Sequence, residues 1–148
     1  MTNKIQKPII GGIAGTVAMT IVTLIAPMMG MPKMSPPAML SMMMGFPIAI
    51  GWLMHFMIGI IFAMMYAFIL INVLKKISNN ILKGAIFGMF AFIFGQIMIA
   101  IMSAMLGGMP AMEGGMMLMM VGSLIGHLVF GIVTVQFIKE PVAERTFA

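Results

Sequence analysis

The sequence predicts an all-α integral membrane protein that crosses the bilayer four times. The chain has 148 residues, of which 62% are hydrophobic and only 7% are charged. A soluble domain carries roughly a quarter charged residues, so this chain has too few charges to cover a folded surface in water. Four apolar segments lie at about 8–29, 48–74, 81–106 and 116–138. Each exceeds the roughly 20 residues that a helix needs to cross about 30 Å of hydrocarbon. We expect one four-span domain over residues 1–148.

Residues that favour helix ends flank these segments. Pro8 and Pro47 are each expected in a first helical turn, where a missing N–H costs nothing. Asn79 or Asn80 is expected to cap the third segment, and Pro141 follows the fourth. The second segment is longer than the bilayer requires, so we expect it to tilt or to extend beyond the membrane.

The distribution of Lys and Arg predicts how the chain is oriented. One side of the predicted topology holds the N-terminus, the middle loop and the C-terminus, with Lys4, Lys7, Lys75, Lys76, Lys83, Lys139 and Arg145. The other side holds only Lys33. Positive residues concentrate on the cytoplasmic side of membrane proteins, so both termini are predicted to be cytoplasmic.

An internal repeat relates the two halves of the chain. A Gly-x3-Gly pair opens the first segment at 11–15 and the third at 84–88, and a Gly-Met-Pro-x-Met loop follows at 30–34 and 108–112. A small-x3-His-x3-Gly motif then appears at 51–59 and at 123–131. Each unit, about 8–74 and 81–138, contains two crossings. We therefore predict two parallel helical hairpins related by an axis along the membrane normal.

Small residues form stripes on the predicted helices. In lipid, such stripes let helix backbones approach closely. The glycines assigned to helix packing on this basis are Gly11, Gly15, Gly51, Gly59, Gly84, Gly88, Gly95 and Gly131.

Methionines concentrate in the two outer loops. Residues 27–47 and 105–120 together hold 15 of the chain's 24 methionines. In the first loop we predict a short interfacial helix at 36–44, between a Ser35 cap and Gly45, with Met39, Met42 and Met43 on one face. Thioethers bind soft ions such as Cu(I) or Ag(I), but methionine is also a flexible apolar residue suited to docking another protein. The candidate metal ligands are Met31, Met34, Met39, Met42, Met43, Met109, Met112 and Met116.

His55 and His127 are the only histidines, and both fall inside apolar segments. An ionisable residue in a membrane span is a candidate functional residue by default. Three interpretations stay open. The pair could join methionines in a copper site, or could be the two axial ligands of one b-type haem. Alternatively, each could simply form a hydrogen bond between helices.

Several classes of function find little support. The chain has no cysteine, and its three carboxylates are Glu113, Glu140 and Glu144, none of which lies inside a predicted span. Neither a catalytic triad nor a carboxylate proton relay can therefore be assembled, and we predict that the protein is not an enzyme. The sequence also shows no basic face that would support nucleic-acid binding.

The two histidine motifs, Gly-Trp-Leu-x-His-Phe-x-Ile-Gly at 51–59 and Gly-Ser-Leu-Ile-Gly-His-Leu-Val-Phe-Gly at 122–131, resemble a family of small bacterial four-helix membrane proteins known only as a domain of unknown function. The resemblance implies a multi-pass protein of a prokaryotic cytoplasmic membrane and no activity. From its small size, glycine stripes and methionine-rich surface we expect an accessory or assembly subunit. Its partners would be lipid and either itself or a larger membrane complex, of a respiratory or metal-containing kind. Cu(I) or Ag(I) handling and b-haem binding are the alternatives.

Overall fold

The computed structural model describes residues 2–107 and 115–138, and every regular element in these ranges is helical. Helix α1 (Thr2–Ile25) continues into the 3₁₀-helix η1 (Ala26–Met29), and the short helix α2 (Pro36–Met44) follows. Helix α3 (Ile48–Met65) runs through the π-helix η2 (Tyr66–Leu70) into α4 (Ile71–Val73). Helices α5 (Asn80–Leu106) and α6 (Met116–Phe137) complete the fold.

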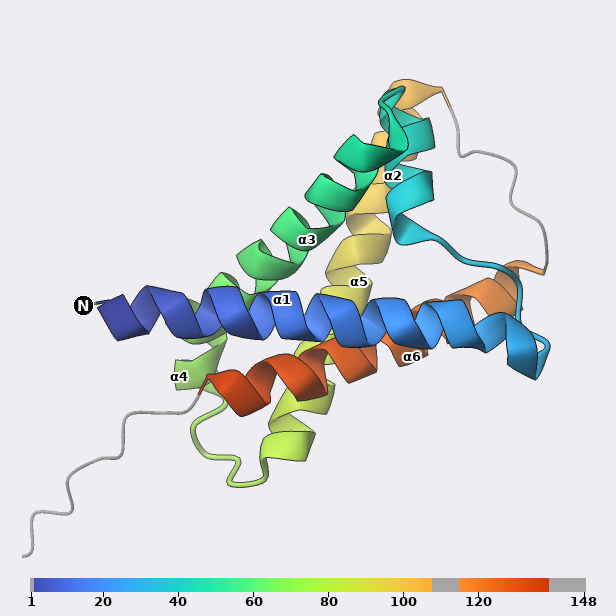
Figure 1. Cartoon of the computed structure of the whole chain (residues 1–148). Coiled ribbons are helices and arrows are strands. Elements are labelled where there is room, and N and C mark those ends of the chain that lie inside the picture. Colours follow the sequence, from blue (N-terminus) through green and yellow to red (C-terminus); the bar gives the residue numbers. More distant parts are fainter. Residues whose placement is uncertain (1, 108–114, 139–148) are drawn as a thin grey trace, which may run out of the picture.

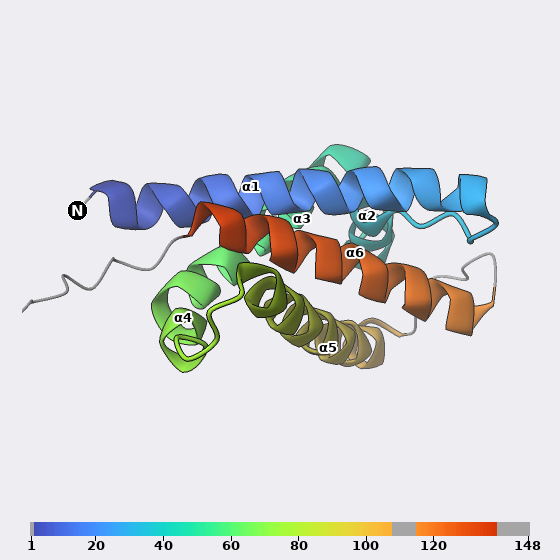
Figure 2. The same ribbon diagram turned by 90° about the horizontal axis from the view of Figure 1, so that it is seen from below.

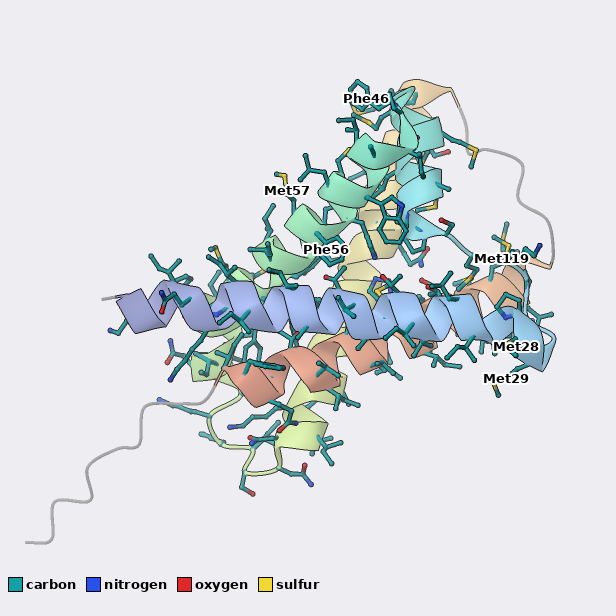
Figure 3. All side chains as sticks on the ribbon, viewed as in Figure 1. Met28, Met29, Phe46, Phe56, Met57 and Met119 are labelled. Carbon is teal, nitrogen blue, oxygen red and sulfur yellow. The ribbon has the colours of Figure 1, made fainter. Side chains whose placement is uncertain are left out.

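Four of these stretches are long and apolar enough to cross a membrane: Lys4–Met29, Ile48–Val73, Asn80–Leu106 and Met116–Phe137. The prediction of four spans is thus confirmed to within a few residues at most ends, and the chain is a multi-pass membrane protein. Large apolar side chains cover the outward faces of the spans. Leu24 is 66% exposed and Ile61 is 60% exposed. Figure 3 shows Met28, Met29 and Met57 pointing away from the bundle. These faces contact lipid.

The predicted helix ends are only partly correct. Helix α1 begins at Thr2, so Pro8 lies inside it rather than in its first turn. The polar residues before Pro8 extend the helix beyond the apolar segment, and the Pro8 side chain is fully buried. Pro47 precedes α3 as its N-cap. Asn79 caps α5, with its side-chain oxygen accepting from the N–H groups of Ile81 at 2.9 Å and Leu82 at 3.2 Å. Pro141 lies outside the described residues.

The helices contact one another in the order α3, α1, α6, α5. Figure 1 shows α1 and α6 running side by side, with α3 and α5 crossing them obliquely. Seen from below, in Figure 2, α5 lies along α6 on the side away from α1. A buried aromatic cluster joins the two outer helices near their loop: the Tyr66 and Phe87 rings lie 4.9 Å apart, and Phe87 and Phe130 of α6 lie 5.7 Å apart.

Glycines let the backbones of α1 and α3 touch. A Cβ added to Gly12 would lie 2.7 Å from the Cα of Ile60 and 2.9 Å from the carbonyl oxygen of Gly59. A Cβ added to Gly59 would overlap the hydroxyl of Thr16. Because real Cβ atoms do not approach this closely, these positions accept only glycine while the helices keep their spacing.

The same contact recurs between α5 and α6, 72 positions later. A Cβ on Gly84 would lie 2.9 Å from the carbonyl oxygen of Gly131, next to Ile132. Gly88, 72 residues after Thr16, meets the backbone of His127 and Leu128. Gly11 and Gly15, which the sequence pattern aligned with this pair, instead contact α6.

The contact between α1 and α6 has no glycine pair of this kind. A Cβ added to Gly11 would lie 3.0 Å from the carbonyl oxygen of Thr134, and a Cβ added to Gly15 would overlap the Thr134 hydroxyl. That hydroxyl donates to the carbonyl oxygen of Gly11 at 3.2 Å, and Thr134 is completely buried. A buried hydrogen bond therefore joins the central helices.

We predict that Gly88→Ala destabilises the protein and that Gly95→Ala, on the same helix, does not. The methyl group added at position 88 would press on the backbone of α6, an overpacking change that costs about 1–3 kcal/mol. At position 95 the nearest atom beyond the helix lies 3.5 Å from the would-be Cβ, an ordinary contact. There, alanine gains helix propensity. Thermal unfolding of both variants in the same detergent measures the difference. Equal melting temperatures would contradict the close backbone contact.

Candidate functional site

A methionine-lined pocket lies where α1, α2, α5 and α6 converge. It has a volume of about 210 Å³ and is open on one side. Six methionines line it: Met19, Met34, Met39, Met116, Met119 and Met120. The remaining lining is formed by Thr23, Ser35, Pro36, Gln96, Ile99 and Ser123. The described lining thus offers six thioethers, three hydroxyls and one amide, and no charged side chain.

Helix α2 closes this pocket because of how it packs on α3. Its buried residues are Pro37, Leu40, Ser41 and Met43. Gly51 of α3 has no side chain, so the carbonyl of Pro37 comes directly against it. Ser35 accepts a hydrogen bond from the N–H of Ala38 at 3.4 Å and so caps α2, and a positive φ of 68° at Gly45 ends it. The predicted bounds, cap and stop of this helix are therefore confirmed.

The three methionines predicted on one face of α2 differ in their surroundings. Met39 points into the pocket, Met42 is 59% exposed, and Met43 is buried outside the pocket. The three share one side of the helix, but that side has different neighbours along its width: Met43 lies next to the buried residues Leu40 and Ser41, and Met42 lies farthest from them.

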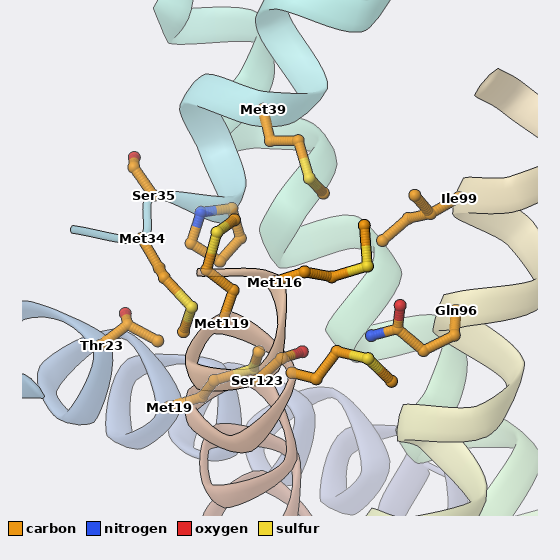
Figure 4. Close-up of a pocket in the computed structure, with 12 residues that line it drawn as sticks. Met19, Thr23, Met34, Ser35, Met39, Gln96, Ile99, Met116, Met119 and Ser123 are labelled. Carbon is orange, nitrogen blue, oxygen red and sulfur yellow. The ribbon is translucent and has the colours of Figure 1, made fainter. Parts of the chain in front are cut away.

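Methionines from different elements extend into the same space. Figure 4 shows Met34, Met39, Met116 and Met119 directed toward one another across the pocket, with the Gln96 amide at its edge. A Cβ added to Gly122 of α6 would lie 3.3 Å from the sulfur of Met34 and 3.6 Å from the sulfur of Met31. Gly122 therefore makes room for the thioethers of the preceding loop.

The eight methionines predicted as ligands divide into three groups. Met34, Met39 and Met116 line the pocket, and Met31 adjoins it at Gly122. Met42 and Met43 lie away from it. Met109 and Met112 lie outside the described residues.

Sequence reasoning missed Met19, Met119 and Met120 as lining residues. Met119 and Met120 belong to the second methionine-rich stretch, so their helical phase on α6 could have identified them. Met19 sits inside α1, next to Thr20, and only the three-dimensional packing brings it to Gly126 of α6.

His55 lies on the buried face of α3. Gly51, His55, Gly59 and Ala63 recur every four residues, and all four are buried. The Nε2 atom of His55 lies 3.3 Å from the hydroxyl oxygen of Thr20 on α1. That hydroxyl donates its single proton to the carbonyl of Thr16 at 2.8 Å. It can therefore only accept from His55, which assigns the proton to Nε2 and leaves Nδ1 with a free lone pair.

His127 has the opposite proton arrangement. Its Nδ1 atom lies 2.7 Å from the carbonyl oxygen of Ser123, one turn earlier on α6. A carbonyl only accepts, so Nδ1 carries the proton and Nε2 keeps the lone pair. Position 92, which is 72 residues after Thr20, is a phenylalanine whose ring meets the His127 ring edge-on at 5.7 Å. With no hydroxyl there, His127 bonds within its own helix.

The two histidines lie behind the polar lining of the pocket. Ser123, the partner of His127, lines it directly, and Met19 and Thr23 flank Thr20, the partner of His55. Within residues 2–107 and 115–138, no hydrogen bond or ring contact joins His55 to His127. Among the described residues, no three histidine, cysteine or acidic side chains come together as a metal-binding group. The thioethers are thus the potential metal ligands that gather in this part of the chain.

Comparison with known proteins gives one result. Residues 2–144 match the model of a family of unknown function (DUF6789), so the chain belongs to that family. The predicted resemblance to a domain of unknown function is confirmed. No curated protein and no solved structure matches the chain.

We predict that the two imidazoles occupy different neutral tautomers. Nitrogen-15 NMR of histidine-labelled protein in detergent should show one ring protonated at Nε2 and the other at Nδ1, because their acceptors are a hydroxyl and a carbonyl. Replacing Thr20 with valine should shift only the His55 signals, and replacing Thr23 with valine is the matched control. Identical tautomers in the two rings would refute the assignment.

Proposed function

We propose that this membrane protein binds a soft monovalent metal ion, Cu(I) or Ag(I), in the methionine-lined pocket, and that it is not an enzyme. The observation that carries the proposal is the convergence of six thioethers from α1, the loop before α2, α2 and α6 on one cavity of about 210 Å³. Three of the six come from α6 and the others from three separate parts of the chain, so the fold, rather than one local run of methionines, brings them together.

The chemistry of the lining selects the ion. Thioether sulfur is a soft ligand that favours Cu(I), whereas Mg²⁺, Ca²⁺ and Mn²⁺ prefer carboxylate, carbonyl and water oxygens. The described lining has no carboxylate, thiol or imidazole. Methionine has three rotatable side-chain bonds, so several thioethers can close on one ion without moving the helices.

The histidines supply nitrogen donors next to the pocket. His127 keeps the lone pair of Nε2, close to Gly95, and the following residue, Gln96, lines the cavity. Imidazole is also a ligand for copper. We assign His127 as a second ligand for the ion, next to the pocket. The Ser123 carbonyl would hold its ring in the required tautomer, as the hydrogen-bond partners of metal-binding histidines do.

A pair of double variants tests the proposed site. We expect the purified protein to take up Cu(I) from a chromogenic Cu(I) chelator. Met34→Leu with Met119→Leu should weaken binding by about tenfold or more, equivalent to about 1.4 kcal/mol. Met28→Leu with Met57→Leu is the control, because both side chains are exposed on the lipid-facing surface. Leucine conserves volume, so both proteins should fold.

Two outcomes would contradict the proposal. One is that the unaltered protein takes no Cu(I) from the chelator. The other is that the two double variants bind Cu(I) equally well. Ag(I), which cannot be oxidised under these conditions, repeats the titration without redox chemistry.

We also propose that the chain forms two parallel hairpins with both termini in the cytoplasm of a prokaryotic cell and with α2 at the outer face. The lysine distribution supports the orientation. The recurrence of the Gly12–Gly59 contact as Gly84–Gly131 supports a duplication. It aligns the halves at an interval of 72 residues, the same interval that separates the two histidines.

Cysteine labelling tests this orientation directly, because the chain has no cysteine of its own. In intact cells, a membrane-impermeant maleimide should label Lys33→Cys but not Lys76→Cys. Both positions should react after the membrane is permeabilised. The reverse pattern would invert the topology and place the methionine-lined pocket on the cytoplasmic side.

The accessory-subunit function and b-haem binding stay predictions. Gly12, Gly59, Gly84 and Gly131 contact helices of the same chain and so are not available to a partner subunit. In the haem alternative His55 would be an axial ligand, but its Nε2 atom faces the hydroxyl of Thr20.

A further inference from the structure

Gly122 is the point on α6 where the loop before α2 comes into contact with that helix. It is buried, and a Cβ added to it would lie 2.8 Å from the terminal methyl carbon of Met34. The sulfurs of Met34 and Met31 are both within 3.6 Å of the same position. Glycine therefore leaves a space on the helix surface that the ends of two thioether side chains occupy.

Helical phase adds a third thioether to this place. Met119 precedes Gly122 by three residues, so the two lie on the same face of α6. Met119 and Met34 both line the methionine-lined pocket, and Figure 4 shows them on the side of the pocket away from Gln96. Three sulfurs thus gather at one end of the pocket, two from the loop and one from α6.

The backbone of the loop is anchored at both ends. The N–H of Met31 donates to the carbonyl oxygen of Ala26 at 3.2 Å, and Ser35, next to Met34, caps α2. The methionine side chains keep three rotatable bonds each. The loop can therefore present two sulfurs from a fixed backbone, while rotation about the side-chain bonds adjusts them around an ion.

We propose that the soft ion binds at Gly122, between the thioethers of Met31, Met34 and Met119, and that it thereby joins the loop before α2 to α6. This inference rests on the proposed function and adds the place of the ion and the effect of its binding. Gly122 acts as a positioning residue, because it touches the ligands without being one. Since the ligands come from two separate segments, the bound ion favours the conformation in which the loop lies against α6.

Gly122→Ala should separate stability from metal binding. The added methyl group displaces the flexible end of Met34 rather than backbone, and alanine has the higher helix propensity, so the melting temperature should stay equal or rise. The Cu(I) affinity should fall by about tenfold or more, as it does when a residue that positions a metal ligand is changed. Val121→Ala is the control, because Val121 is 41% exposed on the same turn, and it should bind Cu(I) like the unaltered protein. Unchanged Cu(I) affinity in Gly122→Ala, or a lower melting temperature, would overturn the assignment of Gly122.

Trypsin cleavage after Lys33 measures whether the ion restrains the loop. Lys33 is exposed and lies between two of the proposed ligands. At a free Ag(I) concentration about ten times the Kd, cleavage there should slow by about tenfold. Cleavage after Lys76, which is exposed in the loop between α4 and α5, should not change and controls for inhibition of the protease. Met31→Leu should abolish the protection, whereas Met29→Leu, at a position that is 78% exposed, should keep it.

The outcomes distinguish this inference from the proposed function on which it rests. If the unaltered protein takes up no Cu(I), both fail. If Cu(I) binds and is lost in the Met34 and Met119 double variant, but Ag(I) leaves cleavage after Lys33 unchanged or protects Met31→Leu equally, the ion binds elsewhere in the pocket. In that case only the site at Gly122 is refuted.

Discussion

The direct contact between helix backbones at glycines is the constraint on which this structure depends. In lipid, apolar side chains gain nothing by leaving hydrocarbon for a helix interface, so association relies on close packing and interhelical hydrogen bonds. The chain meets this requirement twice, at Gly12 with Gly59 and at Gly84 with Gly131. The buried bond from Thr134 to the Gly11 carbonyl joins the two pairs. Each element that lines a site is positioned relative to these contacts.

The glycine contacts also determine where polar groups are placed. The face of α3 that presents Gly59 to α1 presents His55 one turn earlier, which brings His55 to the hydroxyl of Thr20. On α6, Gly122 and Gly126 lie on the side that receives the thioethers of Met34 and Met19. The absence of a side chain at one position thus makes room for a functional side chain from another element. The same glycines therefore determine both how the helices pack and where the side chains of the site lie.

Much of the fold could be predicted from the sequence, and less of the candidate site. Hydrophobic length indicated the four spans, and the Ser35, Asn79 and Gly45 signals indicated helix ends, because these depend only on nearby residues. Local patterns could not show that α2 would turn Met39 inward and Met42 outward, since that rotation depends on Gly51 of another helix. The same applies to Met19, because only the packing of α1 against α6 brings it to Gly126. The sequence pattern matched Gly11 with Gly84, but the glycine whose contact resembles that of Gly84 is Gly12; small residues neighbour each other in α1, and only the contact with Ile60 distinguishes them.

Thr20 and Phe92 stand 72 positions apart, as the two histidines do, and they give the two rings different neighbours. In one continuous chain, each ring acquires its own neighbour, and the pair offers one Nδ1 and one Nε2 lone pair. These atoms project to different distances from the helix axis. A ligand that met both would therefore contact two inequivalent nitrogen atoms, so its two ends would be held differently.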